Sequence, residues 1–468
     1  MRDSSSDFGL LDPLSHDSRS RELTSDGAWL QAMVDVEVAL IRSLVRARLV
    51  PDWMDDVAES ISFAGDLDAG AIAADGRGGG NPVIPLVKQL GAHADQRRAG
   101  ASDSVHVAAT SQDVLDSAAM LVSRHSITEI SRQLDTLAGS LAQLANLHRA
   151  SPLAGRTLGQ HASPTSFGLV VAGWLDGVLG ARRRLDEVNA ALPLQFGGSV
   201  GTLGVLFDIA RARRTDAAPD QVVSEVVVDL AGRLALHAPD SPWHTNRIPI
   251  VELGAALAGV VGAIGSMAID ISVLSRTEIA EVSERLGAGE GSSSAMPHKR
   301  NPVTAVLLIA SARRAPALVA TLFDSLVAED QRPSGAWHAE WTALRELLRL
   351  AIDAATAAVS LAGRLDVDVE RMRSNLEFTD GLIYSERVAT ILAETLGKSD
   401  AFELVAEASR EAVRTNRPLR VVVSARLAGA DHDDELRARV WGAFDPDASL
   451  GSASAIIDRV LARARGQL

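Results

Sequence analysis

The segment from Gly291 to Pro302 combines residue types that bind anions and move protons. It reads Gly-Ser-Ser-Ser-Ala-Met-Pro-His-Lys-Arg-Asn-Pro, so three adjacent hydroxyls precede the run His298-Lys-Arg300. Asn301 is a good N-cap and Pro302 a good first helical residue, and a helix capped by Asn301 is therefore expected to begin here. Cations at a helix N-terminus beside a Gly-rich, hydroxyl-bearing loop predict an anion site under a mobile lid.

Two more polar segments precede apolar helical runs. Thr110-Ser-Gln-Asp113 fits a capping box ahead of the run from Val114 to Val122, and capping alone would explain these four residues. Gly155-Arg-Thr-Leu-Gly-Gln160, followed by Ser163-Pro164, reads as a polar loop that leads into a helix. If these three helix N-termini converge, they would suit a substrate with several carboxylates.

Other motif matches fail on their context. Gly197-Gly-Ser-Val-Gly201 matches the nucleophile elbow, but that motif needs a preceding strand and an α/β sheet, and the sequence predicts neither. His338-Ala-Glu340 resembles a zinc deaminase motif without its cysteines. The chain has 0 Cys, which excludes disulfides, thiolate nucleophiles and Cys-ligated metals. No phosphate-binding loop or H-E-x-x-H zinc motif is present, and we expect neither a metal nor a cofactor.

The charge balance argues against a nucleic-acid partner. The chain has 46 Lys+Arg and 60 Asp+Glu, a net charge of −14, and no basic run. Residues 1–25 are polar and acidic, which predicts no secretory signal. Residues 253–269 are uncharged but fall short of the ~20 apolar residues of a membrane span, and their small side chains favour a central bundle helix. We therefore expect a cytoplasmic protein without a membrane partner.

The elements that must hold these segments are predicted to be helices. Aromatic residues make up 4% of the chain, and the apolar positions follow a helical period. From Leu30 they recur at 3–4-residue spacing to Val45, with Glu37 sharing one position of the stripe with Val38. A second stripe from Ile127 to Leu144 has the spacing of a long, tightly packed helix. Loops rich in Gly, Pro and Ser are expected at residues 75–82, 151–165, 193–204, 238–249 and 286–302.

The sequence predicts an all-α protein of three domains. A chain of 468 residues allows about three domains. The boundaries are expected to separate an N-terminal helical domain (1–103), a central bundle of long helices (104–360) and a C-terminal helical domain (361–468). Long apolar helices tend to bury their remaining faces against copies of themselves, so a homo-oligomer is expected.

These motifs together resemble those of the fumarase/aspartase superfamily. Gly291 to Pro302 is similar to its signature loop, and Thr110–Asp113 and Gly155–Thr157 are similar to its two other characteristic regions. Within the superfamily, Gly80–Leu86 and Gly335–Trp341 resemble the 3-carboxy-cis,cis-muconate cycloisomerase family. That resemblance implies a three-domain helical fold and lactonisation of a small polycarboxylate in protocatechuate breakdown. It also implies a homotetramer whose active sites are built from three subunits, without a metal or organic cofactor.

The resemblance also implies roles for individual residues. Ser294 matches the proton-transferring serine of the loop, although chemistry alone does not separate it from Ser292 and Ser293. The residues that match substrate-binding positions are His106, Thr110, Ser111, Gln195, Lys299 and Asn301.

Four residues depart from the superfamily pattern: Val107, Ala108, Leu158 and Val170. Leu158 replaces a histidine that protonates an amine leaving group, and we expect its side chain in an apolar niche. A carboxylate leaving group, with a pKa near 4, needs no such acid. Leu158 therefore argues against adenylosuccinate and argininosuccinate lyase activity and fits muconate cycloisomerisation. It fits equally well a lyase that eliminates nitrite from nitrosuccinate to give fumarate, and a non-catalytic helical scaffold is the remaining alternative.

Overall fold

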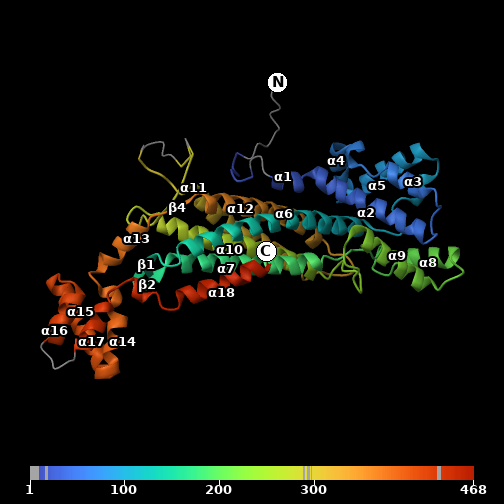
Figure 1. Cartoon of the computed structure of the whole chain (residues 1–468). Coiled ribbons are helices and arrows are strands. Elements are labelled where there is room, and N and C mark those ends of the chain that lie inside the picture. The colour runs from blue at the N-terminus through green and yellow to red at the C-terminus, as the bar shows by residue number, and fades with distance from the viewer. Residues whose placement is uncertain are drawn as a thin grey trace. The chain divides into compact units, whose positions relative to one another are not determined.

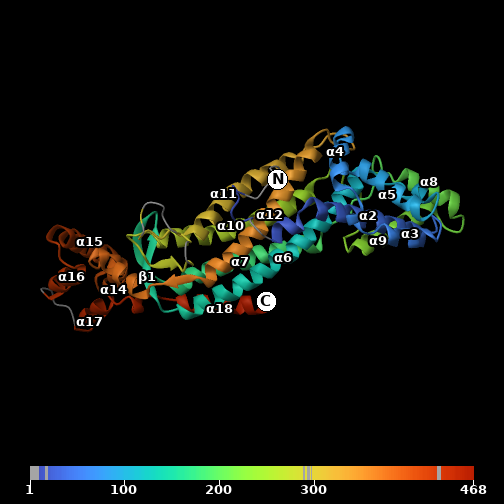
Figure 2. The ribbon, with the colours of Figure 1, turned by 90° about the horizontal axis from the view of Figure 1, so that it is seen from above.

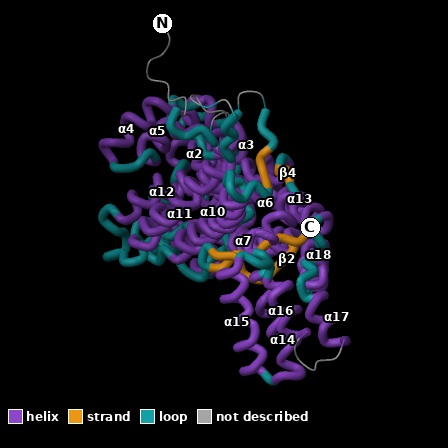
Figure 3. Tube along the Cα trace, turned by 90° about the vertical axis from the view of Figure 1, so that its left-hand side faces the viewer, coloured by secondary structure: helices purple, strands orange, loops and turns teal. Residues whose placement is uncertain are grey.

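The structure is a computed structural model that describes residues 10–15, 19–287, 290–291, 296, 298–428 and 434–467. Helices make up most of the described chain, and its named strands form two short two-stranded sheets (Figure 3). The predicted all-α fold class is confirmed.

Contacts between residues divide the chain into two compact units. Unit 1 comprises residues 1–133, 181–262 and 310–356, and unit 2 comprises residues 134–180, 263–309 and 357–468. The dividing points lie within the long helices, so each of those helices contributes to both units. The three domain boundaries expected from the sequence stay a prediction.

The five longest helices that the structure describes have between 22 and 37 residues. Figure 1 shows them as the longest ribbons of the chain: α6 (Ser111–Leu147), α7 (Phe167–Ala190), α10 (Ile248–Leu274), α11 (Val303–Asp324) and α12 (Ala336–Gly363). Helix α6 begins directly after Thr110, where the capping box predicts it. Within unit 1, Gly254 of α10 lies so close to α11 and α12 that a Cβ there would be 2.4 Å from Leu322 Cδ1. A larger residue at Gly254 would require the Leu322 side chain to move.

Shorter helices complete unit 1, where Figures 1 and 2 both show α2, α3 and α5 together with α8 and α9. The described elements are α1 (Arg19–Leu23), α2 (Asp26–Arg46), α3 (Met54–Ser60), α4 (Ala69–Gly79), α5 (Val83–Arg97), α8 (Gly204–Arg213) and α9 (Pro219–Leu234). The stripe predicted from Leu30 to Val45 lies on α2, where its apolar residues are buried up to Leu44 and Val45 is half-buried. The loop predicted at 75–82 is wrong in its first half, because α4 continues to Gly79 and ends at Gly80, which has a φ of +72°.

A β-hairpin lies where the sequence predicted a loop at 151–165. Strands β1 (Pro152–Thr157) and β2 (Gln160–Ser166) pair antiparallel, with Pro152 opposite Ser166 and Thr157 opposite Gln160. Leu158 and Gly159 form the turn, with φ values of +52° and +80°. A second short sheet pairs β3 (Val282–Glu284) with β4 (Leu365–Val367).

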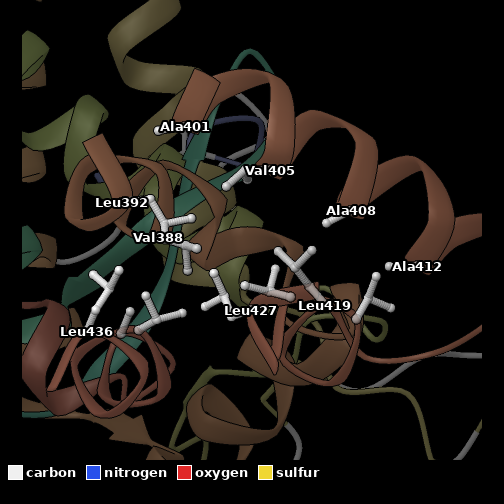
Figure 4. Close-up of a cluster of buried hydrophobic side chains, with 13 residues drawn as sticks. Val388, Leu392, Ala401, Val405, Ala408, Ala412, Leu419, Leu427 and Leu436 are labelled. Atoms are coloured by element: carbon white, nitrogen blue, oxygen red, sulfur yellow. The ribbon is translucent and has the colours of Figure 1, made fainter. Parts of the chain in front are cut away.

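The last described helices of unit 2 are α13 (Val369–Leu376), α14 (Ser385–Leu396), α15 (Lys398–Thr415), α16 (Leu419–Ala428), α17 (Asp434–Gly442) and α18 (Ala453–Gln467). Of these, α14, α15, α16 and α17 enclose a hydrophobic cluster of their own. Figure 4 shows the cluster, in which Val388, Leu392 and Val405 face side chains of α16 and α17 such as Leu427 and Leu436. Burial of these aliphatic side chains gives this part of unit 2 its own core.

Helices α10 and α11 are long and apolar enough to cross a membrane by length and composition alone. In α10, 50% of the most apolar window is buried inside the protein, against 22% in α11. Both helices therefore retain apolar surface that the chain itself does not cover.

Candidate active site

Asp113 is the centre of a buried polar cluster in unit 1. Its side chain is 1% exposed. Its Oδ2 accepts hydrogen bonds from the backbone N–H groups of Thr110 (3.0 Å) and Gly198 (2.9 Å). Its Oδ1 accepts from the Gly197 N–H (2.9 Å) and lies 2.8 Å from His244 Nε2. One carboxylate therefore joins the start of α6 to two loops more than 80 residues away in sequence.

Gln195 is held inside this cluster. Its backbone N–H donates to Ser117 Oγ (3.0 Å), and its side-chain Oε1 accepts from the Trp243 N–H (2.8 Å). Its Nε2 lies 3.4 Å from Asp113 Oδ1, and the residue is 1% exposed. The side chain thus fixes the 193–198 loop against the Trp243 loop, and its contact with substrate stays a prediction.

Glycine is required where the loops meet. A Cβ at Gly197 would lie 2.6 Å from Pro242 Cβ and 2.9 Å from His244 Cε1, and Gly198 has a φ of +68°. The G-x-S-x-G match at Gly197–Gly201 is explained by this close approach and by the backbone conformation rather than by a nucleophilic serine.

Thr110 and Ser111 lie at the N-terminus of α6. The Thr110 hydroxyl accepts a hydrogen bond from Arg332 Nη2 (2.6 Å), which also donates to the Ser199 carbonyl (3.2 Å). Because Thr110 Oγ1 accepts from a guanidinium, its own hydrogen is free to donate to a ligand. The partial positive charge of the helix N-terminus adds to that of Arg332. This arrangement suits an anionic group, and carboxylate binding by Thr110 and Ser111 stays a prediction.

His106 lies a few residues before α6 and is in contact with α2. Its Nδ1 is 2.5 Å from Oε1 of Glu37, and its φ is +58°. Burial opposes the positive charge, but the hydrogen bond to Glu37 and the charges of Glu37 and Asp113 outweigh it and raise the pKa of His106.

A buried ion cluster lies beside these residues in unit 1. Arg247, 1% exposed, donates to Asp116 (2.8 Å from Nη1 to Oδ2) and to Glu340 (2.6 Å from Nη2 to Oε2). Trp337 Nε1 also donates to Asp116 (2.9 Å). Burial, with the negative charge of Asp116, raises the pKa of Glu340 although Arg247 lowers it. The two carboxylates together raise the pKa of Arg247 against the effect of burial. The cluster ties α6 to α12 and to the loop before α10.

In unit 2, the start of α11 differs from the prediction in its cap. The helix begins at Val303, as expected for a segment that follows Asn301-Pro302, but Asn301 is not the capping side chain. Glu284 of β3 instead accepts from the N–H groups of Thr304 (3.1 Å) and Ala305 (2.9 Å). A carboxylate of the protein thus already occupies this N-terminus, and anion binding here has to depend on the cationic side chains.

Asn301 closes the base of the signature loop. Its backbone N–H and its Nδ2 both donate to the Gly291 carbonyl, at 3.1 and 3.2 Å. Gly291 has a φ of +64°, and a Cβ there would lie 2.9 Å from the Asn301 carbonyl oxygen. Asn301 therefore holds the two ends of the loop together, and its role in carboxylate binding stays a prediction.

Lys299 lies in a groove of unit 2 with a volume of about 1180 Å³. Arg276, Arg300 and His298 share this groove with acidic residues that include Asp366 and Asp368. Lys299 is exposed and makes no ion pair with any residue that the structure describes. Ser292, Ser293 and Ser294 lie outside the described residues, so the proton-transferring serine stays a prediction.

Leu158 does not lie in an apolar niche of its own chain. At the tip of the β1–β2 hairpin its side chain is fully exposed, so that expectation is wrong for the single subunit. Two residues before Leu158, Arg156 makes two hydrogen bonds to Glu281, at 2.9 and 2.8 Å, and Asn375 Nδ2 donates to Glu281 Oε1 (2.8 Å). Arg156 therefore serves to hold the hairpin in unit 2.

Sequence reasoning missed two residues of this site, Glu37 and Arg332. Glu37 had a visible signal, because a carboxylate on an apolar stripe needs a partner. Arg332 had a weaker signal, its position in a Pro- and Gly-containing segment just before the Gly335–Trp341 motif. In both cases the partner is distant in sequence.

The helical fold, with the Thr110–Asp113 segment at the start of α6 and the Gly291–Pro302 segment before α11, agrees with the resemblance to the fumarase/aspartase superfamily. The chain matches the family model described as "Lyase" over residues 23–316 and that described as "Adenylosuccinate lyase C-terminus" over residues 381–460. The chain belongs to this superfamily and is an enzyme of the lyase or isomerase type.

Two relatives of similar identity carry different activities in their names. The chain is 43% identical to a nitrosuccinate lyase of Streptomyces davaonensis, over 97% of this chain and 94% of that protein. It is 41% identical to a 3-carboxy-cis,cis-muconate cycloisomerase of Pseudomonas aeruginosa, over 94% and 93%. The crystal structure of the 3-carboxy-cis,cis-muconate lactonizing enzyme from Pseudomonas putida superposes with a TM-score of 0.86 at 36% identity, covering 98% of this chain and 99% of that one.

Proposed function

We propose that the protein is a cofactor-independent cycloisomerase that interconverts 3-carboxy-cis,cis-muconate and its carboxymuconolactone. The observation that carries the proposal is a set of anion-binding groups in a chain that has no leaving-group acid at position 158. Leu158 stands at the position where amine-eliminating relatives have that acid. Thr110, Arg332 and His106 supply donors in unit 1, and Lys299 supplies a cation in unit 2. The names of similar proteins at 41% identity and of similar structures support the choice of substrate.

The proposed chemistry needs one proton and no leaving-group acid. A substrate carboxylate adds to the alkene, and the carbon next to another carboxylate gains a proton through a carbanion drawn as its aci-form. Hydrogen-bond donors placed around that carboxylate stabilise the transition state. Ser294 is proposed to carry the proton, while the carboxylate that adds or leaves needs no protonation near neutral pH.

A second candidate is a lyase that releases nitrite from nitrosuccinate to give fumarate. The specific observation in its favour is the 43% identity to a protein of that name. Nitrite is also weakly basic, so Leu158 fits this reaction equally well. The departures from the superfamily pattern at Val107, Ala108 and Val170 also favour a different substrate.

The two candidates are separated by assaying the purified protein with each substrate in parallel. Cycloisomerisation removes the conjugated diene absorbance of the muconate, whereas elimination from nitrosuccinate produces fumarate absorbance together with nitrite. We expect the muconate to be consumed with the higher kcat/KM. Faster turnover of nitrosuccinate would assign the lyase, and the absence of turnover for both substrates would refute both assignments.

Replacement of Lys299 by Ala is expected to weaken substrate binding. A cation paired with a substrate anion in a partly dry site contributes more than a surface charge. We expect kcat/KM to fall at least about tenfold, which corresponds to roughly 1.4 kcal/mol of transition-state stabilisation. The exposed Lys398 of α15 offers a matched control, because Lys398→Ala removes the same charge from another helix. Unimpaired kinetics in a folded Lys299→Ala enzyme would refute the anion site.

We also propose that the protein is a homotetramer. The exposed residues of α10 follow a strict 4–3 spacing: Ile248, Glu252, Ala255, Gly259, Gly262, Ser266 and Ile269. A Cβ at Gly259 or Gly262 would meet no atom within 4 Å. A stripe with this spacing and small side chains is typical of the contact between tightly packed helices. Sedimentation is expected to give a tetramer at micromolar concentration, and a stable monomer would contradict it.

The active sites are proposed to be shared between subunits, as the family resemblance implies. A cytoplasmic location, with a small polycarboxylate as substrate and no nucleic-acid or membrane partner, remains part of this proposal.

A further inference from the structure

Glu37 is an acidic residue at a core position of α2. Its exposed fraction is 0%, and the neighbouring positions of the same stripe, Val34 and Ile41, are also fully buried. An ionised carboxylate is costly to remove from water unless charge and hydrogen bonds compensate it. A buried glutamate at this position therefore indicates a function that an apolar side chain could not fulfil.

The partner of Glu37 is His106, which is 69 residues away in sequence. Oε1 of Glu37 lies 2.5 Å from His106 Nδ1. Oε2 is buried and accepts no hydrogen bond from any residue that the structure describes. His106 reaches Glu37 from a loop in which His106 and Ala108 both have left-handed backbone, with φ values of +58° and +62°. Non-Gly residues rarely adopt this conformation, so the surrounding contacts must hold the loop in place.

The charges around this pair favour one protonation state. The charged groups that act on the imidazole are Glu37 from α2 and Asp113 from α6, and both are negative. Asp113 is already occupied by backbone N–H groups and by His244. The Glu37–His106 pair has no net charge when Nε2 carries a proton and a charge of −1 when it does not. Burial favours the uncharged pair, whichever of the two residues holds the shared proton.

We propose that Glu37 is a positioning residue that keeps Nε2 of His106 protonated, so that His106 presents an N–H donor to an anionic group of the substrate. The inference rests on the proposed function, because it takes His106 as a substrate-binding residue. The imidazole is suitably placed, since 21% of its surface is exposed and its Nε2 makes no hydrogen bond within the described part of the chain. The raised pKa of His106 agrees with this state.

The sign of the pH dependence follows from the direction of the shift. Because the pKa of His106 is raised, the protonated pair is present below that pKa and is lost as pH rises through it. Substrate binding should weaken over the same range. Without the negative charge of Glu37 the pKa of His106 falls, and the loss of binding moves to lower pH.

The test uses Glu37→Gln, which keeps a hydrogen-bond acceptor for His106 Nδ1 but removes the charge. Hydrogen–deuterium exchange at the imidazole C2, measured against pH by mass spectrometry, reports the pKa of each histidine in the substrate-free oligomer. His106 is the single histidine of the tryptic peptide 99–124, so its titration is read separately. We expect the pKa of His106 to fall in Glu37→Gln and KM to rise about fivefold at a pH where the wild-type pair is still protonated, with a smaller change in kcat.

Asp35→Asn is the matched control, because it removes one carboxylate from the same helix at a residue that contacts Gln31 and not His106. It should leave the pKa of His106 and KM unchanged. An unchanged pKa of His106 in a folded Glu37→Gln protein would overturn the inference whichever substrate the enzyme uses. A lowered pKa with unchanged KM would overturn the role in binding. Since the exchange measurement needs no substrate, a wrong substrate assignment would not be mistaken for failure of the Glu37–His106 pairing.

Discussion

Ser294→Ala is expected to lose most of kcat, about a thousandfold, while binding substrate nearly as well as the wild type. The missing oxygen acts in the transition state, where it would transfer the proton at the carbon next to a substrate carboxylate, and not in the ground state. A loss of this size corresponds to roughly 4 kcal/mol of transition-state stabilisation. The measurement is kcat from steady-state kinetics together with substrate affinity from equilibrium binding.

Ser292→Ala and Ser293→Ala are the matched controls, because each removes one hydroxyl from the same loop. Both should retain most of kcat. The base of the loop, held by Asn301 and the Gly291 carbonyl, is untouched in all three variants. A fully active Ser294→Ala enzyme, or a loss of kcat in one of the other two variants alone, would contradict the assignment of Ser294.

Arg247→Ala is expected to have the largest effect on stability. Removal of the guanidinium would leave Asp116 and Glu340, 3% and 2% exposed, as two buried carboxylates without their cation. Breaking a buried ion pair from one side typically destabilises a protein by about 3–5 kcal/mol. Chemical denaturation at one fixed protomer concentration, compared with wild type, measures the change in the free energy of unfolding.

Arg183→Ala serves as the control for Arg247→Ala. Arg183 pairs with Glu187 on the surface of α7, with 62% of its side chain exposed, and pairs of this kind contribute about 0–1 kcal/mol. We expect its unfolding free energy to stay close to that of the wild type. If the free energy of unfolding of Arg247→Ala were no lower than that of Arg183→Ala, the buried cluster would not contribute to the packing of α6, α12 and the loop before α10.

Helices and their starting points could be predicted because their signals are local. The apolar spacing between Ile127 and Leu144 lies within α6, and the capping box at Thr110–Asp113 marks its first turn. The hairpin at 152–166 was missed because β1 begins with three consecutive buried residues and β2 is mostly polar, so neither strand has the alternation that predicts a strand. Pairing with a neighbouring strand, rather than hydrophobic pattern, holds these residues extended.

The site could be predicted only as separate segments. Asp113 looked like a capping residue, and the sequence contains no signal for its bonds to Gly197, Gly198 and His244. The cap of α11 was assigned to the adjacent Asn301 because sequence rules consider neighbours, whereas the structure uses Glu284 from a strand about 20 residues earlier. Contacts between residues distant in sequence depend on how whole helices pack. Rules that consider only neighbouring residues cannot predict this packing.

The most direct test of the proposed function is the product that the enzyme forms from 3-carboxy-cis,cis-muconate in D2O, analysed by proton NMR. Addition of a carboxylate through a carbanion takes up one solvent-derived hydron and forms one carbon–oxygen bond. We expect a carboxymuconolactone that carries a single deuterium, on the carbon next to a carboxylate. Unchanged muconate, in a preparation that converts nitrosuccinate to fumarate and nitrite under the same conditions, would contradict it.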